Sequence, residues 1–293
     1  MPRIPGRCPK VGVARFSILS NGSLVLMKLA MGIVSGSVSI ISEAIHSTLD
    51  LFASIIAFVA VWISDSPPDR DHPYGHGKYE NVSGVIESLL ILLASGWIIY
   101  EAIHKILSNK PIKSVGAGFI VMMVSAAVNL IVSRKIYQVA KASDSIALEA
   151  DALHLKVDVY VSLGVGCGLL LIWMTGWNLL DPIVAMVIAL FIVKKAYDLF
   201  KNAYSPLLDS SLPENDIDEI EIIIKKHCCD TIKYHNLRTR RAGARKYIDL
   251  HLEVPAGMPV EQAHAICDKI EGDIVCTLKS AEVNIHVEVL KAG

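Results

Sequence analysis

The sequence predicts a polytopic α-helical membrane protein with six transmembrane helices and a small C-terminal α+β domain. Three observations lead to this fold class: an apolar composition, six long apolar segments, and a change to alternating polar and apolar residues after about residue 204. Of the 293 residues, 53% are hydrophobic and only 19% are charged, whereas a soluble domain carries about 25% charged residues. The net charge of −1 gives no sign of a nucleic-acid partner.

The six apolar segments cover approximately residues 12–36, 37–64, 83–105, 114–136, 146–174 and 178–201. Each is long enough to cross about 30 Å of hydrocarbon at about 1.5 Å per helical residue. Basic residues gather at the N-terminus, after the second segment and after the fourth, which places these regions in the cytoplasm by the positive-inside rule. Lys105, Lys110 and Lys113 lie on the other side and weaken this pattern. We expect both termini to be cytoplasmic.

Residues 1–203 are predicted to form the transmembrane domain and residues 204–293 a cytoplasmic domain, joined by the linker SPLLDSSLPEND. Pro213 fits the first turn of a helix, and the acids that follow it complement the helix dipole. Apolar and polar residues alternate in RKYIDLHLEV and AEVNIHVEVL, which predicts strands, and KYHNLRTRR is a third candidate. VEQAHAICDKIEGDIV is predicted to be helical. The resulting order, αββαβ, predicts a small sheet with helices on one face.

Two of the apolar segments contain a histidine and an aspartate at the same spacing. EAIHSTLD contains His46 and Asp50, and DALHLKVD contains His154 and Asp158. Residues four apart on a helix share a face, so facing helices would bring two imidazoles and two carboxylates together. That set suits tetrahedral Zn²⁺. Ionisable groups at membrane depth are costly, which favours a functional site over side chains that merely hydrogen-bond a neighbouring helix.

Two further acids, Glu43 and Asp151, lie one turn before these pairs. They either line the entry path of an ion or lie shallower in the membrane as ordinary interfacial acids. We favour the interfacial position.

The connection between the second and third segments, DRDHPYGHGKYE, is rich in potential metal ligands. His72 and His76 are four residues apart, but Pro73 and two glycines predict a loop. Asp69 or Asp71 could complete a cytoplasmic metal site of the DxxHxxxH kind. The alternative is that these histidines cap and solvate a structured turn.

Histidines are also dense in the C-terminal domain. His235, His251 and His286 lie on the three predicted strands, and His264 lies on a predicted helix. With Glu288 they predict a surface zinc site, and a solvated sheet face is the alternative. The cysteines form no CxxC pair, and we expect reduced thiols and no metal at the adjacent Cys228 and Cys229 on the predicted helix.

The segments SEAIHSTLDLFAS, HPYGHGKYE, ALEADALHLKVDVYVSLGV and HNLRTRRAG resemble the cation diffusion facilitator family, and the resemblance covers residues 12 to 290. It implies a homodimeric exporter of divalent transition metals in the cell membrane of a bacterium. Such exporters exchange metal for protons by alternating access. The resemblance implies a transport site of His46, Asp50, His154 and Asp158, a loop site of Asp69, His72 and His76, and a dimer-stabilising tail site of His235, His251, His264, His286 and Glu288.

The expected function is therefore Zn²⁺/H⁺ antiport out of the cytoplasm, with zinc as substrate and also as ligand of the tail. His46 stands where related bacterial proteins often have Asp, which favours zinc. Export of Fe²⁺, Co²⁺, Mn²⁺ or Cd²⁺ is the first alternative, and a dimeric metal-responsive regulator without transport is another. Because no HExxH motif is present, a metallopeptidase is disfavoured and we expect no enzyme. The expected partners are a second copy of the chain, the lipid bilayer and divalent metal ions.

Overall fold

The computed structural model describes residues 7–35, 38–108, 116–175, 180–229 and 231–290. For some helix residues in these ranges, His46 among them, only the backbone is described. The chain divides into two compact units, which we call the helical unit (Met1–Tyr204) and the C-terminal unit (Ser205–Gly293).

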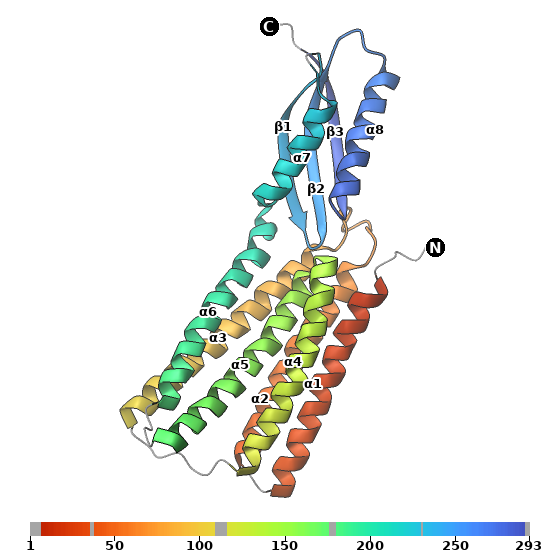
Figure 1. Cartoon of the computed structure of the whole chain (residues 1–293). Helices are drawn as coiled ribbons and strands as arrows, with labels where there is room; N and C mark the ends of the chain where they lie inside the picture. Colours follow the sequence, from red (N-terminus) through yellow and green to blue (C-terminus); the bar gives the residue numbers. More distant parts are fainter. Residues whose placement is uncertain (1–6, 36–37, 109–115, 176–179, 230, 291–293) are drawn as a thin grey trace. The chain divides into compact units, whose positions relative to one another are not determined.

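In the residues that the structure describes, the helical unit consists of six long helices (Figure 1). α3 packs against α6 and α5, α1 against α2 and α4, and α2 against α5. The two helices that carry the HxxxD pairs are therefore neighbours. The bounds of the helices are α1 (Arg7–Ser35), α2 (Val38–Ser64), α3 (Lys78–Ser108), α4 (Gly116–Ser143), α5 (Ile146–Thr175) and α6 (Leu180–Tyr204).

Two stretches are long and apolar enough to cross a membrane when only the described residues are searched: Pro9–Met31 in α1 and Lys78–His104 in α3. Asp50–Ser64 in α2 is apolar but shorter. The number of membrane spans therefore stays a prediction.

Small residues and one buried ion pair hold the helices close together. A Cβ on Gly84 of α3 would lie 2.7 Å from Ile146 Cγ2 of α5 and 3.0 Å from Ala203 Cβ of α6, so only glycine fits there. Near the start of α3, Glu80 is buried and forms an ion pair with Lys10 of α1 at 3.1 Å. Its carboxylate also accepts hydrogen bonds from two serines, Ser64 at the end of α2 and Ser145 before α5.

The C-terminal unit begins with a short 3₁₀ helix, η1 (Ser205–Leu208), and continues in the predicted αββαβ order. Its sheet has the order β1-β2-β3, with β1 and β2 antiparallel and β2 and β3 parallel. The bounds are α7 (Glu214–His227), β1 (Lys233–Ala242), β2 (Arg245–Val254), α8 (Val260–Thr277) and β3 (Ala281–Val289).

The apolar residues that alternate with polar ones along β2 form part of the core of this unit, as expected. Ile248, Leu250, Leu252 and Val254 are buried on the face that the helices cover, and apolar residues of α7 and α8 pack against them. In β3 the apolar face is covered only in part, since Val283 is buried whereas Val287 and Val289 are exposed. The polar residues of the strands lie on the opposite face of the sheet, where the predicted ligands that come from the strands are placed.

Candidate metal centres

The first group of potential ligands lies between α2 and α5 in the helical unit. Asp50, His154 and Asp158 each offer one ligand atom, and these atoms all lie within 4.8 Å of one another. Nε2 of His154 is 3.0 Å from Oδ1 of Asp50. The helical spacing places His154 and Asp158 on one face of α5, and the packing of α2 against α5 brings Asp50 to them. His46 lies in α2 one turn before Asp50, but its side chain is outside the described residues.

These three side chains line a cavity of about 690 Å³ in the helical unit. The cavity is also lined by Lys28 of α1, whose Nζ donates a hydrogen bond to Ser47 Oγ at 2.6 Å. Ser125 and Asn129 reach it from α4. The sequence reasoning missed these residues, although Lys28 could have been found as an isolated charge within an apolar segment.

Two acids of the helical unit are fully buried close to this group. Asp151 of α5 accepts a hydrogen bond from Ser54 of α2 at 2.8 Å, and Glu87 of α3 accepts one from Ser83 at 3.1 Å. Asp151 is therefore not exposed as an ordinary interfacial acid would be, because the packing of α1, α2 and α5 encloses it. The side chain of Glu43 lies outside the described residues.

The second group lies in the loop between α2 and α3 and contains Asp69, His72 and His76, again with ligand atoms within 4.8 Å of one another. The loop conformation orients Asp69, since Oδ1 accepts the backbone N–H of His72 at 2.6 Å and that of Asp71 at 3.0 Å. The hydrogen bond from the His72 backbone lowers the pKa of Asp69, so its carboxylate stays ionised. Asp71 acts here as a backbone donor and is not in the group.

The third group lies on the exposed face of the sheet in the C-terminal unit. His235, His251 and Glu288 come from β1, β2 and β3, and their ligand atoms lie within 4.8 Å of one another. The strand register explains this placement, because His235 pairs with His251 and His251 pairs with His286. Nδ1 of His251 is 2.9 Å from Glu288 Oε1, and Nε2 of His286 is 3.7 Å from the same oxygen.

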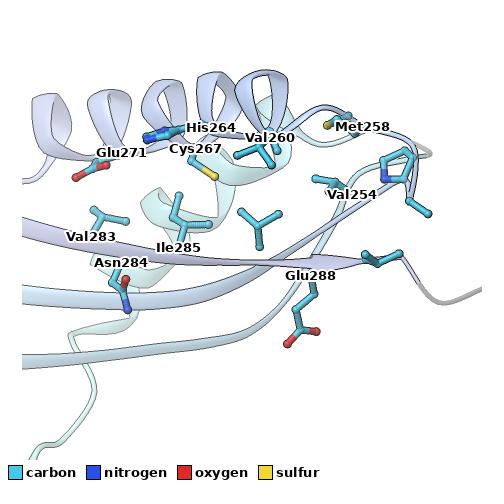
Figure 2. A pocket seen from close by; sticks show the side chains of 15 residues that line it. Val254, Met258, Val260, His264, Cys267, Glu271, Val283, Asn284, Ile285 and Glu288 are labelled. Carbon is cyan, nitrogen blue, oxygen red and sulfur yellow. The ribbon is translucent and has the colours of Figure 1, made fainter.

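His264 lies apart from the third group within one chain. It is exposed on α8, where its Nδ1 is 3.0 Å from Oδ1 of Asp268. Figure 2 shows His264 on the side of β3 that faces α8, whereas Glu288 points to the other side of the sheet. Its part in a tail site therefore stays a prediction.

Two family profiles together cover most of the chain. Residues 14–208 match the cation efflux transmembrane domain, and residues 212–289 match the cytoplasmic domain of cation efflux proteins. Both profiles describe transporters, which confirms the expectation that the chain is not an enzyme.

Two relatives of similar length also support membership in a family of cation efflux transporters. An uncharacterized transporter of Synechocystis sp. is 33% identical over 94% of this chain and 90% of its own length. The cation-efflux pump FieF of Shewanella oneidensis is 31% identical over 93% of this chain and 92% of its own. Among solved structures, the candidate zinc transporter CzrB is 32% identical over 28% of this chain and 100% of that one, with a TM-score of 0.27. The metal-bound C-terminal domain of the CzcD transporter from Thermotoga maritima is 29% identical over 27% of this chain and 91% of that one, with a TM-score of 0.25. The chain belongs to the cation diffusion facilitator family, whose members are membrane transporters that export metal cations.

Proposed function

We propose that this protein exports Zn²⁺ from the cytoplasm in exchange for protons, and that Asp50, His154 and Asp158, together with His46, hold the metal during transport. The observation that carries the proposal is the convergence of the three described ligands between two packed helices of the helical unit. An imidazole with two carboxylates suits a borderline cation such as zinc, and a second imidazole from His46 would complete a tetrahedral set.

Proton exchange follows from the chemistry of these ligands. Zinc binds neutral imidazole and ionised carboxylate, so protons compete with zinc for the same atoms. Binding from the cytoplasm would release protons inward, and an acidic exterior would protonate the ligands and release the zinc. Moving a charge of +2 outward against an inside-negative potential of 100 mV costs about 4.6 kcal/mol, which entering protons can offset.

The proposed architecture has six membrane spans in the inner membrane, both termini in the cytoplasm and two copies of the chain. Six helices of 25 to 31 residues support the number of spans. The loop group and the sheet group would bind zinc on the cytoplasmic side, and the sheet group would stabilise the dimer. The match to a cytoplasmic domain of cation efflux proteins supports this placement of the C-terminal unit.

The test is zinc flux into proteoliposomes with and without a pH gradient. Asp50→Ala removes one ligand and is expected to lower flux by about 100-fold or more, on the order of 2.7 kcal/mol. Asp198→Ala, which removes an exposed carboxylate of α6, is the matched control and should transport normally. Normal flux in the Asp50 variant would show that this group does not carry the substrate. Competition by Fe²⁺, Co²⁺, Mn²⁺ and Cd²⁺ in the same assay ranks the metals.

A further inference from the structure

A single acid in the middle of α3 has no role in the site described above. Glu87 is 0% exposed, and apart from the hydrogen bond from Ser83 to Oε1 its carboxylate is poorly satisfied. The other oxygen, Oε2, is buried without a hydrogen-bond partner. A buried acceptor left in this state is costly, so a folded protein keeps one where some state of the molecule provides the missing donor.

His154 of α5 also has a buried polar atom without a hydrogen-bond partner. Its Nε2 faces Asp50, at 3.0 Å from Oδ1, while Nδ1 on the other side of the ring is buried without a partner. α3 packs against α5, and Gly84, one turn before Glu87, permits the two helices to approach closely. Glu87 lies near enough to His154 for the two side chains to interact electrostatically. The interior thus holds an unsatisfied carboxylate oxygen on α3 and an unsatisfied ring nitrogen on α5, and these two helices pack against each other.

The chemistry of metal-binding histidines joins these two observations. A histidine that binds a metal through one nitrogen almost always donates the N–H of the other nitrogen to a carboxylate, a carbonyl or water. That hydrogen bond sets the tautomer and the ring orientation and makes the metal-binding nitrogen more basic. We propose that Glu87 is a positioning residue that accepts the Nδ1–H of His154 and so presents Nε2 to the transported metal. The inference rests on the proposed role of His154 as a ligand.

Asp151 is the rival acceptor. It also has a buried oxygen without a partner, Oδ2, and it lies on the same helix three residues before His154. However, its carboxylate is drawn toward α2 and α1, because Oδ1 accepts from Ser54, whose hydroxyl is in turn bonded to Ser17 and Asn21. Glu87 has no comparable network, so its carboxylate is the freer of the two to meet the imidazole.

The experiment compares four variants in the full-length protein in proteoliposomes, with zinc as the probe. Glu87→Leu removes the acceptor and is expected to raise the KM for zinc by about 10- to 100-fold. Glu87→Gln keeps an acceptor oxygen without the charge and should lie between Leu and wild type. Glu101→Gln, an exposed acid of the same helix, is the matched control and should behave as wild type. Asp151→Asn tests the rival and should change KM less than Glu87→Leu does.

A second measurement separates positioning from mere stability. In zinc-loaded protein labelled with ¹⁵N-histidine, His154 should carry its proton on Nδ1 in the wild type and in Glu87→Gln, and should become a mixture of tautomers in Glu87→Leu. An unchanged tautomer and KM in Glu87→Leu, or a larger effect of Asp151→Asn, overturns the inference. Loss of thermal stability without a change in KM also overturns it. Normal flux in His154→Ala would instead remove the proposed function itself, so the two failures are distinguishable.

Discussion

The ligand group of the helical unit and the ligand group of the sheet have nearly the same chemistry in opposite surroundings. The side chains of His154 and Asp50 are 13% and 10% exposed, between two helices of an apolar unit. Those of His235 and Glu288 are 45% and 32% exposed on an open sheet face. Burying ionisable groups costs free energy that exposed groups do not lose. Burial, more than ligand type, therefore distinguishes the two groups: the charges of the buried group need compensation from a partner, whereas water can solvate those of the exposed group.

The strongest test of this comparison is the same substitution in both units. His154→Ala should lower the kcat/KM for zinc by about 100-fold or more, which is on the order of 2.7 kcal/mol, because one of the proposed ligands of the transported ion is lost. His251→Ala, which removes a histidine from the sheet, should change it by less than about threefold. Both values come from initial zinc flux in proteoliposomes at matched protein density. Equal losses in the two variants would mean that the sheet group takes part in transport directly.

Zinc binding by the sheet group should instead raise the stability of the folded protein. A ligand that binds only the folded state at 100 times its Kd stabilises that state by about 2.7 kcal/mol. Glu288→Ala removes the carboxylate that contacts His251 and should abolish most of the zinc-dependent rise in unfolding temperature of the full-length protein. Glu282→Ala, an exposed acid of the same strand, serves as the control and should keep the rise. A full zinc-dependent rise in the Glu288 variant would show that the metal binds elsewhere.

The two regions also differ in what the sequence could predict. The HxxxD spacing and the apolar segments predicted which residues face each other across α2 and α5, because helical periodicity is local. The start of α3 at Lys78, five residues before the predicted segment, depends on Glu80 being neutralised by Lys10, which no local pattern shows. Glu87 was missed for the same reason, whereas Lys28 could have been found as an isolated charge within an apolar segment. The role of a charged residue inside an apolar segment becomes clear only when the neighbouring helix and the residues that it contributes are known.

On the sheet, the alternation predicted the faces but not the register. The row of His235, His251 and His286 depends on strand alignment and on an irregularity in β1 between His235 and Arg238, where Asn236 has a φ of 52°. A shift by one residue would have moved these side chains to the opposite face. The position of His264 outside this row was likewise not predictable, since it depends on which face of the sheet α8 covers.

The loop group is intermediate, because it is exposed like the sheet group but lies in a turn that hydrogen bonds to Asp69 stabilise. The hydrogen bond from the His72 backbone lowers the pKa of Asp69, so the turn it stabilises is intact above the ordinary aspartate pKa of 3.8 and weakens only as the pH falls through the lower folded-state value. Between pH 7.5 and 5.5 Asp69 therefore remains ionised, so protons do not compete with zinc for its carboxylate in this range.

Asp69→Asn should consequently lower zinc affinity at the loop by about tenfold, and by the same factor at every pH in that range. The measurement is competition with a chromophoric zinc chelator, in a background with His154→Ala and His251→Ala so that the loop group is isolated. Asp71→Asn is the control, because the structure shows Asp71 only as a backbone donor to Asp69. A loss that grows or shrinks with pH would mean that Asp69 itself titrates there.

The smallest effect is expected at the cysteines that follow α7. Cys228 and Cys229 come after the end of the helix and not on it, since α7 ends at His227. Burial raises the pKa of the Cys228 thiol, with a smaller contribution from Cys229, so the protonated form persists at neutral pH and a thiolate ligand is disfavoured. The neighbouring imidazole of His227 interacts with Asp273, since Nε2 lies 2.9 Å from Oδ2.

Zinc bound per chain in the Cys228→Ser, Cys229→Ser double variant should equal the wild-type value in equilibrium dialysis. Loss of one zinc would place a thiolate site beside the sheet, and the contrast between a buried transport group and an exposed sheet group would no longer account for all the metal that the chain binds.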